Sequence, residues 1–327
     1  MAYPKFLKIG TFVFILSSVF IFISCKNESK KEKMNEDKAL KMESNPFFKL
    51  SLAQWSLHRT FNDKGVSPFK FAEMAKDMGF EGIEYVSQIY LDQIKELGFD
   101  KVIDSLKVMS DINSITNVLI MVDNEGDIAN PDEEARNKAV ENHMKWVNAA
   151  QKLGCHSIRV NTFGTNDYDV WKVTVVDGLK KLSEYATTKN INILCENHGW
   201  LSSDAPKLME AIKEVNMSNC GTLPDFGNWC IKRKEGAQWG ECEEEFSDKY
   251  KGIQMMLTNA KAVSAKSYDF DDIGNETTLD YPRIISMVKD SGYESFIGVE
   301  YEGKRLNEKD GILATKALLL NSVKGLN

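Results

Sequence analysis

Short runs of β-branched and aromatic residues alternate with longer amphipathic segments from Phe47 onward. The short runs predict strands, because their apolar residues are continuous or recur at every second position; they cover 49–57, 82–87, 114–122, 156–162, 191–197, 221–225, 262–267 and 296–301. The longer segments repeat apolar residues three and four positions apart and predict helices, over 68–79, 92–110, 132–153, 169–189, 205–215, 244–260, 281–291 and 308–323. The chain thus has eight predicted strand–helix units.

Eight consecutive units of this kind predict a parallel sheet, because parallel strands are joined through helical crossovers. Helix starts are marked at Asn130-Pro131-Asp132-Glu133 and at Asp280-Tyr281-Pro282, where the acidic residues are good helix caps. No Gly-x-Gly-x-x-Gly follows the first strand, which disfavours a dinucleotide-binding sheet. We therefore expect an α/β fold, a single-domain (β/α)8 TIM barrel over residues 47–327.

The residues before this barrel have the pattern of a targeting segment. An apolar run over 9–23 ends at Phe22-Ile23-Ser24-Cys25, after two lysines. The run is short for a membrane-spanning helix, which needs roughly 20 apolar residues, and it predicts a signal peptide over 1–25. Its end resembles a bacterial lipobox, so Cys25 is expected to carry lipid; an ordinary signal peptide or an uncleaved anchor is the alternative. The polar tract 26–46 predicts a flexible linker, and the protein is expected to be an exported periplasmic or cell-surface lipoprotein.

Charge and cysteine usage narrow the range of partners. The chain has 41 Lys and Arg against 48 Asp and Glu, a net charge of −7, and no basic stripe that would neutralise phosphates. Nucleic acid is therefore not an expected partner, and contact with a membrane is expected only through the lipid. Five cysteines remain beyond Cys25, without a CxxC pair. Cys230 and Cys242 share one loop, where an optional disulfide is feasible after export.

Three acids stand at the ends of apolar strands, at Glu196, Asp225 and Glu300. The carboxyl ends of the strands form the active-site mouth of a TIM barrel, so these acids are expected to converge there. Carboxylates held close together need a neutralising cation or protons. Oxygen ligands suit Mn²⁺, Mg²⁺ or Co²⁺, with Zn²⁺ also feasible. The alternative is that each acid caps a helix or pairs with Lys or Arg at the rim.

Further polar side chains at the same strand ends could contact a small-molecule substrate through their hydrogen-bonding groups. An ordinary structural role, in a loop, in the core or in a salt bridge, is the alternative for each of them. These candidate substrate-binding residues are His58, Glu84, Asn161, His198, Asn228 and Lys266.

Three segments resemble a known family: Glu196-Asn197-His198-Gly199, Asp225-Phe226-Gly227-Asn228 and Val299-Glu300-Tyr301-Glu302-Gly303. They are similar to the xylose-isomerase-like barrel superfamily, in the group of sugar phosphate isomerases and epimerases. The resemblance implies that the first acid of each segment binds one divalent metal together with a His that ends the seventh strand. Ser264 stands at the position of that His, so a water or the charge of Lys266 could take its place.

The expected activity is proton abstraction next to the carbonyl of a sugar, as in an isomerase or epimerase. Glu196 and Glu300 are the expected pair, one removing the proton and the other returning it, while a metal or Lys266 holds the enediolate oxygen. A lyase or hydratase acting on a keto-glycoside shares the first step, and export favours it because sugar phosphates are cytoplasmic. A non-catalytic glycan-binding lipoprotein is the alternative outside enzymes. The expected partner is a small sugar or keto-glycoside, and the oligomeric state is left open.

Overall fold

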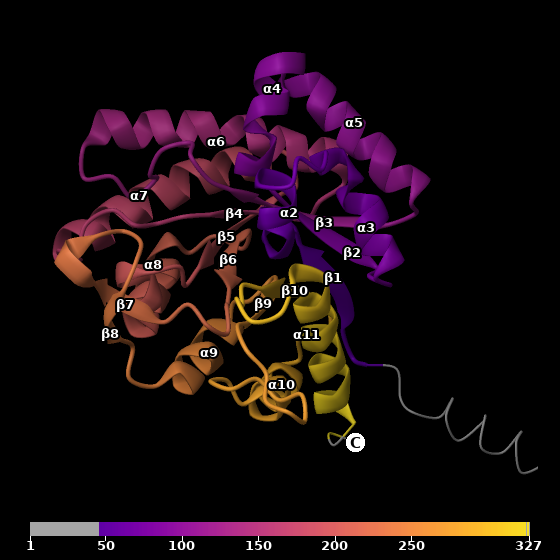
Figure 1. Cartoon of the computed structure of the whole chain (residues 1–327). Coiled ribbons are helices and arrows are strands. Elements are labelled where there is room, and N and C mark those ends of the chain that lie inside the picture. The colour runs from indigo at the N-terminus through magenta and orange to yellow at the C-terminus, as the bar shows by residue number, and fades with distance from the viewer. Residues whose placement is uncertain (1–45, 325, 327) are drawn as a thin grey trace, which may run out of the picture. The chain divides into compact units, whose positions relative to one another are not determined.

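The computed structural model describes residues 46–324 and 326 (Figure 1). The predicted signal peptide, Cys25 and nearly all of the predicted linker lie outside these residues. Eight parallel strands form one sheet in the order β6-β5-β4-β3-β2-β1-β10-β9. Their bounds are Lys49–Ala53 for β1, Gly82–Val86 for β2, Thr116–Val122 for β3, Ser157–Val160 for β4, Asn192–Glu196 for β5, Cys220–Leu223 for β6, Val263–Ser267 for β9 and Phe296–Tyr301 for β10.

The first and last strands of this order also meet, which closes the sheet into a barrel. Thr222 pairs with Ala260, and Asp225 with Ser264, in parallel bridges. The amide of Ser264 donates to the carbonyl oxygen of Pro224 at 3.0 Å. The expectation of a (β/α)8 TIM barrel is therefore confirmed.

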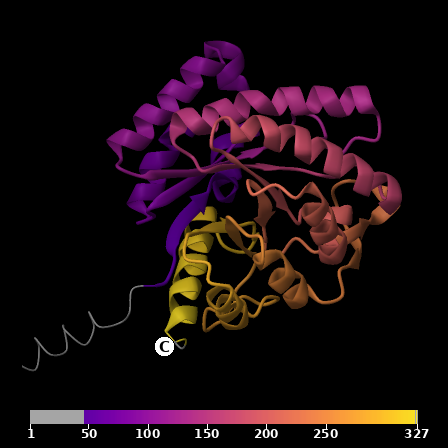
Figure 2. The same cartoon turned by 180° about the vertical axis from the view of Figure 1, so that it is seen from behind.

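Ten α-helices of the described residues surround the strands, as both views show (Figures 1 and 2). Aspartate side chains cap several of them, as at Asp132, Asp204 and Asp280, each accepting a hydrogen bond from an amide in the first turn. The helices are α2 His58–Asn62, α3 Phe71–Asp77, α4 Leu91–Leu97, α5 Phe99–Ile112, α6 Glu133–Leu153, α7 Tyr168–Thr187, α8 Ala205–Val215, α9 Lys249–Leu257, α10 Tyr281–Asp290 and α11 Glu308–Val323.

Short 3-10 turns connect several of these elements. They are η1 Gln54–Leu57, η2 Pro68–Lys70, η3 Ser87–Tyr90, η4 Trp200–Ser203 and η5 Lys234–Gly236.

Three sequence-based boundaries were wrong. The first strand ends at Ala53, because the chain turns into η1 instead of staying extended to residue 57. The predicted helix 92–110 is two helices, divided at Gly98, whose φ of +89° is incompatible with a continuous helix. The predicted helix 244–260 begins later than expected, at Lys249, the first residue of α9. Its first residues belong to β8, Cys242–Glu245, which pairs antiparallel with β7, Cys230–Arg233, in a separate hairpin.

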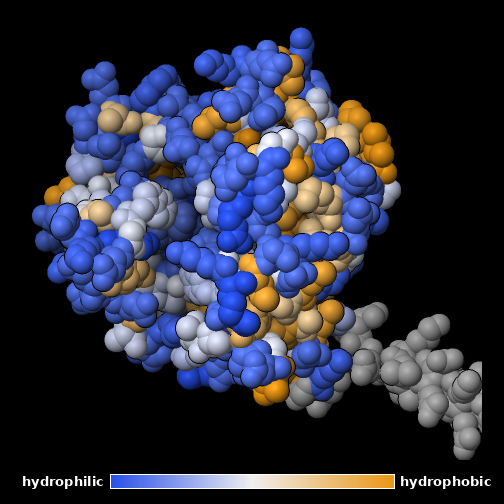
Figure 3. All heavy atoms as spheres, in the orientation of Figure 1, coloured by the Kyte–Doolittle hydropathy of each residue, from blue (hydrophilic) through white to orange (hydrophobic). Residues whose placement is uncertain are grey.

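The core lies inside the barrel and between its strands and helices. The inward and outward faces of the strands are both buried, so β2 and β4 have no exposed residue, as expected for a parallel sheet covered on both sides. The face drawn in Figure 3 is largely hydrophilic. Among the described residues, none of the helices combines the length and apolar character that crossing a bilayer requires.

Candidate active site

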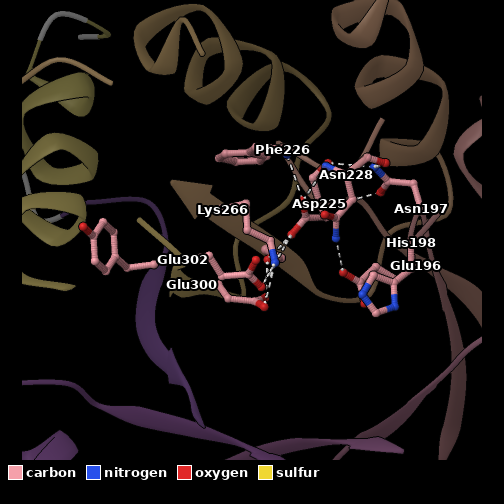
Figure 4. Close-up of polar contacts among 12 residues, drawn as sticks. Glu196, Asn197, His198, Asp225, Phe226, Asn228, Lys266, Glu300 and Glu302 are labelled. Carbon is pink, nitrogen blue, oxygen red and sulfur yellow. Dashed lines mark hydrogen bonds and ion pairs between the residues drawn. The ribbon is translucent and has the colours of Figure 1, made fainter. Parts of the chain in front are cut away.

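The three acids at the strand ends lie together in the structure. Glu196 is the last residue of β5, Asp225 follows β6 by two residues, and Glu300 lies near the end of β10. All three are buried, and each offers a carboxylate oxygen within 4.8 Å of the other two (Figure 4). The three strands thus bring them to one end of the barrel.

Asp225 is held rigidly by its neighbours. Its Oδ1 accepts hydrogen bonds from the amides of Gly227 and Asn228 at 2.8 and 2.9 Å. Its own amide donates to Oδ1 of Asn197 at 2.7 Å, and the Asn197 amide group donates back to the Asp225 carbonyl oxygen at 2.9 Å. Oδ2 accepts a hydrogen bond from the hydroxyl of Ser264 at 2.6 Å. Only Oδ2 therefore faces the other acids.

Lys266 places a positive charge next to the acids Asp225 and Glu300. Its Nζ lies 2.7 Å from Oε1 of Glu300, 2.8 Å from Oε1 of Glu302 and 3.9 Å from Oδ2 of Asp225. Burial disfavours the ammonium, but Glu300, Glu302 and Asp225 outweigh it and hold the pKa of Lys266 well above its usual range. The side chain is only 1% exposed and does not line the cavity. Substrate contact by Lys266 therefore stays a prediction, and in this structure its ammonium is engaged by Glu300 and Glu302.

Glu196 faces a second cation, Arg159 of β4. Its Oε1 accepts a hydrogen bond from Asn228 Nδ2 at 3.0 Å. Its Oε2 lies 2.9 Å from Nε of Arg159, but the two groups are not aligned as a hydrogen bond. Burial raises the pKa of Glu196 to about 7, with Glu300 adding to the shift and Arg159 opposing it. Glu196 is thus poised to exchange a proton near neutral pH.

Arg159 was not identified from the sequence, although an Arg in the apolar run Ser157–Val160 was a usable signal. It donates to Oδ1 of Asp123 at 2.9 Å and to Oδ1 of Asn161 at 3.1 Å. Asn161 in turn donates to Asp123 at 2.6 Å and contacts Nδ1 of His198 at 2.7 Å. Burial and the charge of Arg159 lower the pKa of His198 to about 3. This imidazole is therefore neutral and hydrogen-bonds as a polar, uncharged group.

A cavity of about 810 Å³ opens over these residues. Among the candidate substrate-binding residues, Asn161, His198 and Asn228 line it, as does Glu300.

His58 does not line the cavity. Its ring stacks on that of Trp55, with centroids 4.7 Å apart, and its Nδ1 lies 2.7 Å from the Trp55 carbonyl oxygen. Trp55 itself does line the cavity. Direct substrate contact by His58 therefore stays a prediction; in this structure its ring packs on Trp55 and supports it.

Glu84 also lies away from the cavity. It points into the barrel from β2 and accepts a hydrogen bond from Ser51 at 2.6 Å. A Cβ on Gly298 would come within 2.5 Å of its carboxylate, so a larger residue there would require the Glu84 side chain to move. Burial raises the pKa of Glu84 to about 8. This raised pKa favours the protonated form of Glu84 at neutral pH, and the predicted contact of Glu84 with substrate stays a prediction.

The donor set fits a divalent metal ion. Oε2 of Glu196 is buried and accepts no hydrogen bond from the described residues. Asp225 Oδ2 and Glu300 Oε2 share the hydroxyl of Ser264, at 2.6 and 3.1 Å. Three carboxylate oxygens within 4.8 Å of one another can thus be supplied to one cation.

A closed barrel with its cavity at the carboxyl ends of the strands is the arrangement of TIM-barrel enzymes. Residues 72–321 match the family model described as a xylose isomerase-like TIM barrel, so the chain belongs to this family. This confirms the resemblance found in the sequence. No curated protein sequence matches the chain.

Several solved structures share the fold. The apo 3-keto-D-glucoside 4-epimerase YcjR from E. coli has a TM-score of 0.64 and 14% identity, over 85% of this chain and 100% of that one. The IOLI protein with a bound zinc atom has a TM-score of 0.62 and 17% identity, over 85% and 98%. The probable 3-DHS dehydratase AsbF from Bacillus anthracis has a TM-score of 0.60 and 19% identity, over 83% and 98%. At this identity they establish the fold alone.

Proposed function

We propose that the protein is a sugar isomerase or epimerase that moves a proton on the carbon next to a carbonyl group. The observation that carries this is the placement of two buried carboxylates, Glu196 and Glu300, whose oxygens lie within 4.8 Å of each other near the carboxyl ends of β5 and β10, where Glu300 lines the cavity. One carboxylate removes the α-proton, and the other returns a proton to the neighbouring carbon or to the opposite face.

The remaining groups have separable roles in this proposal. Asn161, His198 and Asn228 orient the sugar hydroxyls, since all three line the cavity. Arg159 also lines it and would stabilise the substrate oxygen that becomes negative as the proton leaves. Lys266 holds the Glu300 carboxylate in position by donating a hydrogen bond to it. A divalent ion held by Glu196, Asp225 and Glu300 would supply further stabilisation of that negative oxygen.

A lyase or hydratase acting on a keto-glycoside is the second candidate. The solved structures that share the fold include a probable dehydratase as well as a keto-glucoside epimerase. Loss of a leaving group after the same proton abstraction gives an elimination, so both candidates use the same carboxylates. A non-catalytic glycan-binding barrel accounts less well for the retention of all three buried acids.

The first step of the reaction can be tested without knowing the natural sugar. The purified protein is incubated in heavy water with keto-hexoses and 3-keto-glycosides, and incorporation of deuterium next to the carbonyl is followed by NMR. Exchange is expected on at least one substrate, and the product then separates epimerisation from elimination. Sugar binding without any exchange would instead support the glycan-binding barrel.

Metal binding gives a separate prediction. Mn²⁺ or Co²⁺ should raise the melting temperature of the protein, because an ion that binds only the folded state stabilises it by mass action. Ser264→His should tighten binding by restoring a nitrogen ligand, and Asp225→Asn should weaken it by about tenfold or more, because it removes a ligand charge. Calorimetric titration measures all three proteins. If neither the parent nor Ser264→His binds an ion, the acids serve the reaction without a metal.

We also propose that the protein is an exported lipoprotein attached to a membrane through Cys25. The lipobox-like end of the signal peptide supports this proposal. Cys25→Ser should shift the protein from the membrane fraction to the soluble fraction or leave the signal peptide uncleaved. Fractionation and metabolic labelling with a fatty acid measure the change. A variant that fractionates, migrates and labels as the parent does would contradict the assignment.

A further inference from the structure

The hairpin of β7 and β8 forms a wall of the cavity that the proposed chemistry does not use. It lies between β6 and α9 in the chain and pairs only with itself among the described residues. A disulfide joins Cys230 to Cys242 across it. The cavity-lining residues that it contributes are Cys230, Arg233, Gln238, Trp239, Cys242 and Glu245.

Trp239 at the hairpin tip is held in position yet half exposed. Its ring centroid lies 5.4 Å from that of Phe163 and 5.1 Å from that of His198, both edge to face. The Arg233 guanidinium lies 5.7 Å from the centre of the Trp239 ring. The side chain is nevertheless 53% exposed. An indole that packs against three side chains and is still half exposed offers an apolar surface to a ligand ring.

The cavity is large enough for a ligand that reaches both this ring and the acids. At about 810 Å³ it lies in the upper part of the range of about 300–1,000 Å³ that holds drug-sized ligands. His198 stands between the two ends, because it contacts Trp239 on one side and Asn161 of the polar network on the other. Because Glu300 and Trp239 both line this one cavity, a two-ring ligand can place one ring at each of them.

The charges around the cavity select against anionic ligands. Its acidic lining residues outnumber the basic ones, and one of the two basic residues, Arg159, is already paired with Asp123. A phosphorylated sugar would meet net repulsion here, whereas a neutral glycoside would not. The acidic lining residues are Asp123, Asp127, Glu245, Glu300 and Glu302, and the basic ones are Arg159 and Arg233.

From these observations we infer that the disulfide-linked hairpin is a second-ring subsite and that Trp239 determines specificity for neutral glycosides of at least two rings. The inference deepens the proposed function, because it names the substrate class of the same cavity. The disulfide holds the hairpin so that Trp239 meets the second ring without first being ordered, which reduces the entropic cost of binding.

Equilibrium binding tests this subsite independently of catalysis. Calorimetry compares cellobiose, lactose and their 3-keto forms with glucose and 3-keto-glucose. The parent should bind at least one two-ring ligand about tenfold more tightly than its one-ring counterpart. Trp239→Ala should lose that advantage and leave one-ring binding unchanged, while Trp239→Phe should keep most of it. The double variant Cys230→Ser/Cys242→Ser should reduce the advantage through a looser hairpin.

Several outcomes would overturn the inference. Equal affinity of the parent for one-ring and two-ring ligands would do so, as would an advantage that survives Trp239→Ala. Tighter binding of glucose 6-phosphate than of glucose would contradict the neutral class. The proposed function fails in a different way, namely when two-ring ligands bind through Trp239 but no deuterium enters any keto-sugar. Circular dichroism and the melting temperature of each variant confirm that the barrel is intact.

Discussion

Glu196→Gln and Glu300→Gln should each slow deuterium exchange on the best substrate by about 10² or more, the usual contribution of a positioned acid or base. Glutamine keeps the shape and hydrogen-bonding capacity of each side chain but can no longer take the α-proton. The measurement is the initial exchange rate by NMR at saturating sugar. Glu302→Gln is the matched control, since Glu302 also accepts a hydrogen bond from Lys266 but is not part of the acid cluster.

The pH profile adds a second check on the same pair. Burial raises the pKa of Glu196 to about 7, so the ionised base is scarce below that pH and exchange by the metal-free protein should increase as the pH rises through 7. In Glu196→Gln, any exchange that remains should no longer increase as the pH rises through 7. Unchanged rates in both Gln variants would refute the assigned roles of the two carboxylates.

Much of the architecture could be predicted from the sequence because it depends on periodicity. The acids ending β5, β6 and β10 were identified because each follows an apolar run, and parallel strands place their ends at one mouth. The hairpin was missed because Glu244 and Glu245 were interpreted as the start of a helix, whereas the structure pairs them with β7 and joins Cys242 to Cys230. The secondary-structure propensity of a short segment does not predict which other segment it pairs with.

The partners of the site residues were harder to predict than the residues themselves. Lys266 and Glu84 both stand at inward positions of strands, but whether an inward side chain meets the cavity or the interior depends on its depth in the barrel. Depth follows from the stagger of the strands, which sequence periodicity does not fix. Arg159 was missed because its partners, Glu196 and Asp123, come from β5 and from the residue after β3.

Lys266→Met should be the most destabilising single substitution at the site, costing about 3–5 kcal/mol of the free energy of unfolding near pH 8. Methionine fills a similar volume but leaves Asp225, Glu300 and Glu302 without the ammonium that now lies within 3.9 Å of each. Urea denaturation measures the loss. Lys138→Met is the matched control, since Lys138 pairs with Glu141 on the exposed face of α6, where an ion pair is worth at most about 1 kcal/mol.

The loss should depend on pH in a direction that the buried acids dictate. Burial raises the pKa of Asp225 above its usual value even with Lys266 present, and removing the ammonium must raise it further. At acidic pH, protonation of Asp225 can therefore compensate for the missing ammonium of Lys266. The loss of stability caused by Lys266→Met should then be smaller at pH 5 than at pH 8. A penalty equal to that of Lys138→Met, or one that does not change between the two pH values, would mean that the ammonium does not hold these acids together.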